Sequence, residues 1–106
     1  MFVYTVACDF TNMDVAEQWL SWLRDEHLRE VCEAGAIQAE AVRLDAAPAG
    51  SAVRCEARYR FASRQAFEQY EREQAPRLRA EGLKRFPLER GLSYTRSTGE
   101  ITCRIG

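Results

Sequence analysis

His27, the only histidine of the chain, is the residue best suited to acid–base chemistry. An imidazole titrates near neutral pH, and Glu30 follows three residues later, on the same side of an expected helix. A histidine beside a carboxylate is a common general acid–base arrangement. We therefore predict His27 and Glu30 as candidate catalytic residues. In the alternative, a semi-buried His27 only bonds to Glu30 or to the backbone and stabilises the helix end.

Large side chains near His27 have the composition of an apolar pocket wall. Trp19 and Leu23 share the apolar helix face with His27, and Trp22 lies at the edge of that face. Tyr59 is on an expected strand, where its hydroxyl could orient a ligand. We predict Trp19, Trp22, Leu23 and Tyr59 as ligand-binding residues. Ordinary core packing is the alternative for each of them.

Motifs for metals and cofactors are missing from the sequence. The four cysteines, at positions 8, 32, 55 and 103, form no C-x-x-C pair, and a single histidine cannot complete a usual structural metal site. There is no glycine-rich phosphate loop, no G-x-S-x-G and no H-E-x-x-H. We therefore expect no metal and no cofactor, and we expect the cysteines to be reduced, with Cys8 and Cys55 buried.

Length and composition favour one globular domain spanning residues 1–106. Hydrophobic residues make up 46% and charged residues 29%, and the formal net charge of −1 gives no electrostatic reason for a nucleic-acid or acidic-membrane partner. No apolar run approaches the ~18 residues of a membrane span. The N-terminal residues alternate like a strand and lack a charged leader, so we expect a cytoplasmic protein.

Hydrophobic periodicity predicts six main elements. They are a strand over 2–10, a helix over 13–34, strands over 37–44 and 52–61, a helix after Ser63 that breaks just before Pro76 and ends at Pro87, and a strand over 89–97. Thr98 and Gly99 are expected to turn the chain into a short tail, which is a candidate extra edge strand.

The order β-α-β-β-α-β predicts an α+β, ferredoxin-like fold with an antiparallel sheet in the order 4-1-3-2 and both helices on one face. The opposite face of the sheet is then uncovered. It carries Val3, Ala7 and a row of alternating charged residues from Arg54 to Arg60. We predict a homodimer that packs through this open sheet face, with charged side chains paired across the two-fold axis.

Two short runs resemble a known group of proteins. These are Trp22-x4-His27-Leu28-x-Glu30-Val31 in the first helix and Tyr70-x4-Ala75-Pro76-x-Leu78 in the second. They are similar to a family of small bacterial proteins of unknown function with a dimeric α+β barrel fold. More distantly, the architecture is similar to antibiotic-biosynthesis monooxygenases, muconolactone isomerases and related stress-response barrels. The resemblance implies a homodimer with a pocket between sheet and helices in each protomer. It carries over no activity, because the most similar family has none established.

Three hypotheses of function follow. The first is a homodimeric barrel that binds or transforms a small apolar or aromatic molecule near His27. The second is a structural or scaffolding dimer without a ligand site. The third is an RNA-binding sheet, which would need stacking aromatic rings on the open face, whereas the aromatic residues of the third strand are expected on the helix-covered face. A cavity that reaches His27 distinguishes the first hypothesis from the second.

Overall fold

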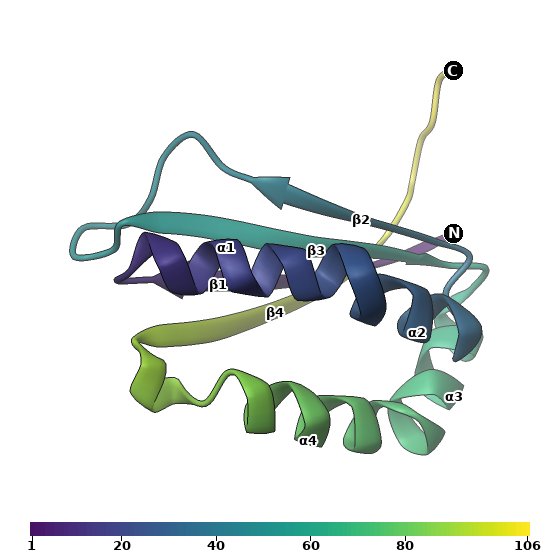
Figure 1. The fold of residues 1–106 in the computed structure, drawn as a ribbon. Coiled ribbons are helices and arrows are strands. Elements are labelled where there is room, and N and C mark those ends of the chain that lie inside the picture. Colours follow the sequence, from purple (N-terminus) through teal and green to yellow (C-terminus); the bar gives the residue numbers. More distant parts are fainter.

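The computed structural model describes all 106 residues (Figure 1). Along the chain the elements are β1 (Phe2–Phe10), α1 (Met13–Trp22), the π-helical turn η1 (Leu23–His27), α2 (Leu28–Glu33), β2 (Gln38–Arg43), β3 (Val53–Phe61), α3 (Arg64–Glu73), α4 (Ala75–Arg85), the 3-10 turn η2 (Leu88–Arg90) and β4 (Leu92–Glu100). No helix is both long enough and apolar enough to cross a membrane.

The four strands form one antiparallel sheet in the order β2-β3-β1-β4, which confirms the predicted order. The central pair is in full register from Phe2 opposite Phe61 to Phe10 opposite Val53. Helices cover one face of this sheet, and the other face has no covering element (Figure 1). The fold is therefore ferredoxin-like, as the order of elements predicted.

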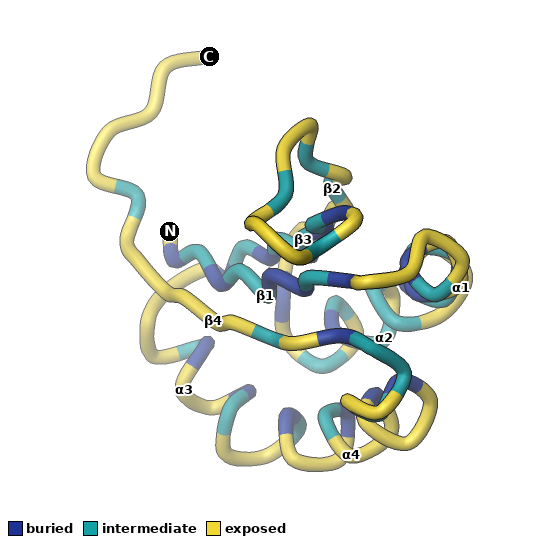
Figure 2. The backbone as a smooth tube through the Cα atoms, turned by 90° about the vertical axis from the view of Figure 1, so that its left-hand side faces the viewer, coloured by how far each residue is buried: buried dark blue, intermediate teal, exposed yellow.

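Burial follows the alternation of the central strands. In β3 every second residue from Val53 to Phe61 is buried beneath the helices, and the residues between them are half-buried on the open face. Buried residues, which are dark blue in Figure 2, also line the inward side of the helices. Val6 is an exception on β1, because it faces the helices yet remains half-exposed. A helix-facing valine that is not covered marks a gap in the core.

Side-chain caps determine where two of the helices begin. The Asn12 side chain accepts hydrogen bonds from the backbone N–H groups of Asp14 and Val15, and the Ser63 hydroxyl accepts one from Ala66. The predicted break before Pro76 is confirmed, because α3 ends at Glu73 and α4 begins at Ala75. A proline in the first turn costs nothing there, since its missing N–H would have no partner inside the helix.

The C-terminal region differs from the prediction in two ways. Thr98 and Gly99 do not turn the chain, because β4 continues to Glu100 and pairs with β1 along its whole length. The expected extra edge strand is also wrong. Residues 101–106 leave the sheet after one hydrogen bond from the Ile101 N–H to the Met1 carbonyl, and they extend away from the body (Figure 2).

Charged side chains on the open sheet face are mostly paired within the chain. Arg54 donates two hydrogen bonds to Asp9 on the neighbouring strand, at 2.6 and 2.8 Å, and Arg58 pairs with Glu56 on its own strand. The Asp9 pKa is lowered, chiefly by its hydrogen bond with Arg54. Arg54 and Arg58 thus have partners within the same chain, and the pairing of charges across a two-fold axis stays a prediction.

Gly91 closes η2 at a φ of +84°, and a Cβ there would collide with the Thr11 hydroxyl. Gly50 has a similar φ of +88° but open space around it. We expect Gly50→Ala to cost about 1 kcal/mol of stability from the backbone alone, and Gly91→Ala about 1–2 kcal/mol more. Urea unfolding of both variants measures the difference. Equal costs would show that the contact between Gly91 and Thr11 relaxes freely.

The four free cysteines differ in exposure: Cys8 and Cys55 are fully buried opposite each other in the central strand pair, Cys32 is half-buried, and Cys103 is exposed. Burial raises the Cys8 pKa to about 12, which removes the reactive thiolate near neutral pH. With a disulfide reagent, we expect one fast thiol in native protein and four in denaturant. Cys103→Ser should abolish the fast phase. Rapid labelling of all four native thiols would contradict the burial of Cys8 and Cys55.

Candidate functional site

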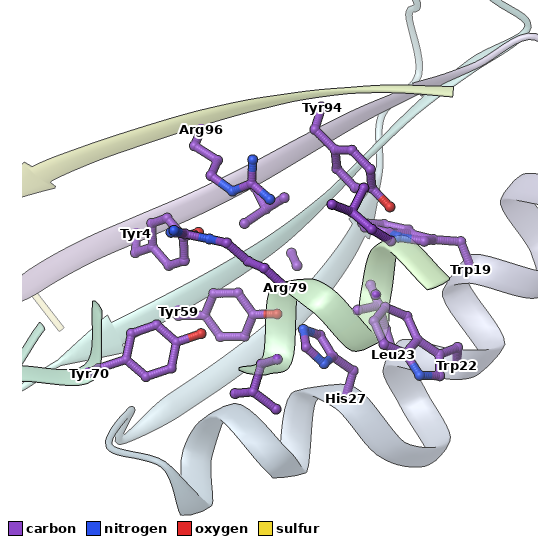
Figure 3. A pocket seen from close by; sticks show the side chains of 15 residues that line it. Tyr4, Trp19, Trp22, Leu23, His27, Tyr59, Tyr70, Arg79, Tyr94 and Arg96 are labelled. Atoms are coloured by element: carbon purple, nitrogen blue, oxygen red, sulfur yellow. The ribbon is translucent and has the colours of Figure 1, made fainter. Parts of the chain in front are cut away.

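A cavity lies between the helix-covered face of the sheet and the helices (Figure 3). It has about 500 Å³ of empty space when the solvent at its mouth is counted. The enclosed part of the cavity has a volume of about 50 Å³, several times the volume that one buried water molecule needs. Eleven of its fifteen lining residues are hydrophobic, and half-exposed Val6 is among them. A molecule larger than the enclosed part of the cavity would extend toward the mouth.

Five of the six predicted site residues line this one cavity. They are Trp19, Trp22, Leu23, His27 and Tyr59. Glu30 does not line it and instead lies near His27 on the outer side of α2. The structure thus brings the predicted residues together, while their roles in binding or catalysis stay predictions.

The helix predicted over 13–34 contains a wide turn, η1, directly beside the cavity. The Leu28 N–H bonds to the Leu23 carbonyl five residues earlier, where a regular α-helix would use the carbonyl four residues earlier. Leu23 and His27 are the two ends of this turn, and both line the cavity. Neither proline nor glycine occurs in the turn, so the sequence offered no signal for it.

His27 is largely buried and has no hydrogen-bond partner. Its Nδ1 atom is enclosed and lies 3.6 Å from a Glu30 carboxylate oxygen, which is too far for a hydrogen bond. Burial lowers the His27 pKa to about 4, so the imidazole is neutral near pH 7. The nearby carboxylate does not reverse this shift. A neutral imidazole can donate or accept a hydrogen bond, but it is a weak base at a pKa of about 4.

Glu30 is the more accessible member of the pair. Burial raises its pKa, and the neighbouring carboxylates of Glu81 and Glu26 raise it further. Its side chain is 38% exposed, against 16% for His27. Glu30 therefore lies at the surface among the charged groups of Glu26, Glu81, Arg77 and Arg85, and its catalytic role with His27 stays a prediction.

Trp22 stacks on His27 and holds it in the cavity wall. The two rings are nearly parallel, with centroids 4.2 Å apart, and Phe86 packs on Trp22 at 5.4 Å. Gly82 of α4 leaves room for this stack, because a Cβ there would come within 3.3 Å of the Trp22 ring. Trp22 thus packs against His27 and Phe86 of the same chain.

Trp19 is buried against Phe10 at a ring distance of 5.5 Å. Its indole N–H lies beside the Tyr94 hydroxyl (Figure 3), although the contact falls outside strict hydrogen-bond geometry. Burial raises the Tyr94 pKa to about 12, against an opposing effect of that indole. Trp19 therefore directs its indole N–H toward the neutral phenol of Tyr94 at one end of the cavity.

Tyrosine side chains line the far end of the cavity from Trp19. Tyr4 and Tyr59 stack on adjacent strands at 5.8 Å, and Tyr70 packs from α3 at 6.4 Å from Tyr4. Burial raises the pKa of Tyr59 well above its usual range, so its hydroxyl keeps its proton. These phenols offer hydrogen bonds to a ligand without offering charge.

Sequence reasoning missed two arginines of the cavity wall. Arg79 of α4 donates to both carboxylate oxygens of Glu71, each at 2.6 Å, and to the Tyr4 hydroxyl at 3.2 Å. Arg96 lies two residues after Tyr94 on β4, so strand alternation could have predicted its helix-facing position. The contact of Arg79 with Glu71 spans eight residues and a helix break, and local spacing gives no sign of it.

The site can bind a molecule more readily than it can perform acid–base catalysis. It combines apolar walls with three buried nitrogens that have no hydrogen-bond partner, those of Trp19, His27 and Arg79. Buried polar groups in folded proteins are usually paired, so each such atom calls for an explanation. No group of three or more His, Cys, Asp or Glu residues is placed to hold a metal ion.

Fold and site together define a ferredoxin-like α+β protein with a cavity between sheet and helices. More particularly, the chain belongs to DUF4286, a family described as a domain of unknown function, whose pattern matches residues 1–97. No match was found among curated proteins.

Several solved structures are similar in fold. A dimeric ferredoxin-like protein from an uncultured marine organism is 14% identical, with a TM-score of 0.71, over 99% of this chain and 98% of its own. HapK from Hahella chejuensis is 14% identical, with a TM-score of 0.68, over 100% and 98%. An ethyl tert-butyl ether family protein from Bacillus halodurans is 14% identical, with a TM-score of 0.62, over 95% and 100%.

Proposed function

We propose that the cavity beside His27 binds a small, largely apolar molecule with an aromatic ring. The observation that carries this proposal is the composition of the wall: eleven of fifteen lining residues are hydrophobic, and three of the lining residues, Trp19, His27 and Arg79, each hold a buried nitrogen without a hydrogen-bond partner. Apolar walls with a few convergent polar groups are typical of ligand pockets. Transformation of the ligand is the weaker part of the first hypothesis, because His27 is a poor base at neutral pH.

Tryptophan fluorescence can test binding directly, because the only two tryptophans, Trp19 and Trp22, both line the cavity. We expect toluene and benzamide to change the emission in a saturable way and to raise the melting temperature. Val6→Phe, which adds a ring to the cavity wall, should abolish both effects. Leu88→Phe adds the same kind of ring at an exposed position outside the cavity and should preserve them.

If neither probe changes the emission or the melting temperature of wild type at millimolar concentration, the ligand-site proposal fails and the structural or scaffolding dimer remains. If Val6→Phe binds the probes as well as wild type does, the probes bind elsewhere.

We also propose that the protein is a homodimer that packs through the open sheet face. We place it in the cytoplasm, because its four cysteines are free and thiols stay reduced in that compartment. Val3, Thr5 and Ala7 form a weakly polar strip along β1 on this face, and two of the similar structures are described as dimeric. The face carries no aromatic ring, so the RNA-binding alternative lacks its stacking surface.

At micromolar concentration we expect a sedimenting species of twice the 12.2 kDa chain mass. Thr5→Glu places a charge near the middle of the face and should shift the species to monomer, whereas Leu88→Glu, at an exposed site outside the sheet, should not. A 12.2 kDa wild-type species would contradict the dimer.

A further inference from the structure

We infer that the ligand is an anion, a small aromatic carboxylate, and that Arg96 is the residue that recognises its charge. This inference rests on the proposed ligand site and specifies its chemistry. The starting point is the charge of the wall: Arg79 and Arg96 are among the fifteen lining residues, and no aspartate or glutamate is. An apolar cavity bordered only by cations favours a molecule with one negative end.

The two arginines have different roles. Arg79 is already neutralised by Glu71, with both carboxylate oxygens at 2.6 Å, and it is further tied to the Tyr4 hydroxyl. Its remaining Nε–H is buried without a partner, so it can donate one hydrogen bond but supplies little free charge. Arg79 therefore acts as a fixed part of the wall.

Arg96 has no ion pair within the chain. It lies opposite Val6 in the sheet register and thus on the cavity side of β4, where its guanidinium carbon is 5.5 Å from the centre of the Tyr94 ring. Figure 3 shows it reaching from β4 to the same side of the cavity that Arg79 reaches from α4. A stacked, uncompensated guanidinium beside an apolar cavity is suited to bind a carboxylate through two parallel hydrogen bonds.

The two ends of such a molecule would occupy different parts of the cavity. The enclosed part of the cavity, about 50 Å³, is smaller than the roughly 150 Å³ that hold a benzene ring, so an aromatic ring would also occupy the open part between the aromatic walls. The carboxylate would then lie near the mouth, where Arg96 is exposed. The Arg79 Nε–H can donate to a second acceptor of the same head group. A charged head at the mouth avoids the large cost of burying an unpaired charge.

Benzoate and benzamide test the inference because they have the same shape and differ in charge. With tryptophan emission as the readout, we expect wild type to bind benzoate at least tenfold more tightly than benzamide. Arg96→Gln should weaken benzoate binding roughly ten- to hundredfold and leave benzamide binding unchanged. Arg96→Lys should recover part of the loss, because it keeps the charge without the paired donors.

Arg104→Gln removes the same charge from the exposed tail and should leave both affinities as in wild type. Equal binding of benzoate and benzamide by wild type would overturn the anion assignment and leave the apolar site standing. An equal loss of both probes in Arg96→Gln would overturn the role of Arg96, because it would show that the change damages the cavity itself. Failure of both probes to bind wild type would remove the site and the anion together.

Discussion

Lowering the pH from 7 to 5 is expected to reduce the free energy of unfolding by about 2 kcal/mol through His27 alone. The His27 pKa is about 4 in the folded chain and near 6.5 in the unfolded chain. The unfolded state therefore binds the proton first as the pH falls. The stability from this residue is complete above about pH 6.5 and is lost progressively down to about pH 4.

The comparison of wild type with His27→Gln isolates this effect. Glutamine keeps a polar side chain of similar size that does not titrate, so the variant should lack this part of the slope between pH 7 and 5. Glu30 is present in both proteins, and its raised pKa acts in the opposite direction, since protonation then favours the folded state. Urea unfolding at a fixed protein concentration measures both curves. Parallel curves would mean that folded His27 titrates normally.

Phe61→Ala is expected to cost about 3–5 kcal/mol of stability, the largest effect of any single truncation considered for this chain. Phe61 is fully buried at the end of β3, with the rings of Phe67 and Tyr70 at 5.3 and 5.2 Å. Removing its ring leaves a void among aromatic side chains that cannot close without moving α3 against the sheet. A loss of this size is a large part of the stability of a small domain.

Phe61→Leu is the matched control, because it keeps most of the volume and should cost about 1–1.5 kcal/mol. Both variants should unfold in one transition together with the rest of the chain, as the proposed single domain over residues 1–106 requires. A truncation cost below 1 kcal/mol would mean that the aromatic cluster is looser than its ring distances indicate.

Much of the fold could be predicted because its signals are local. Alternation identified β1 and β3, and the order of elements then defined the sheet, since few topologies connect them with right-handed crossovers. Pro76 marked the helix break within two residues. The end of β4 was missed because Thr98 and Gly99 are typical turn residues, yet pairing with β1 outweighs that preference.

The site was predictable only in part. The helical wheel grouped Trp19, Leu23 and His27 correctly around one cavity. It also paired His27 with Glu30, and these two side chains do lie near each other, but at 3.6 Å they are too far apart for a hydrogen bond. The neutral state of His27 depends on burial by distant elements, and the positions of Arg79 and Arg96 depend on tertiary packing, which a single sequence does not encode locally.

The wide turn η1 also bears on how this chain tolerates changes of length. A hydrogen bond to the fifth residue back accommodates one residue more than a regular helical turn does. Deleting exposed Arg24 or Asp25 would therefore shorten the turn to an ordinary one and leave Val31 facing the core. In a regular helix the same deletion would rotate every later side chain by about 100°. A variant that lacks one residue here would thus keep the same core while losing the backbone shape that lines the cavity.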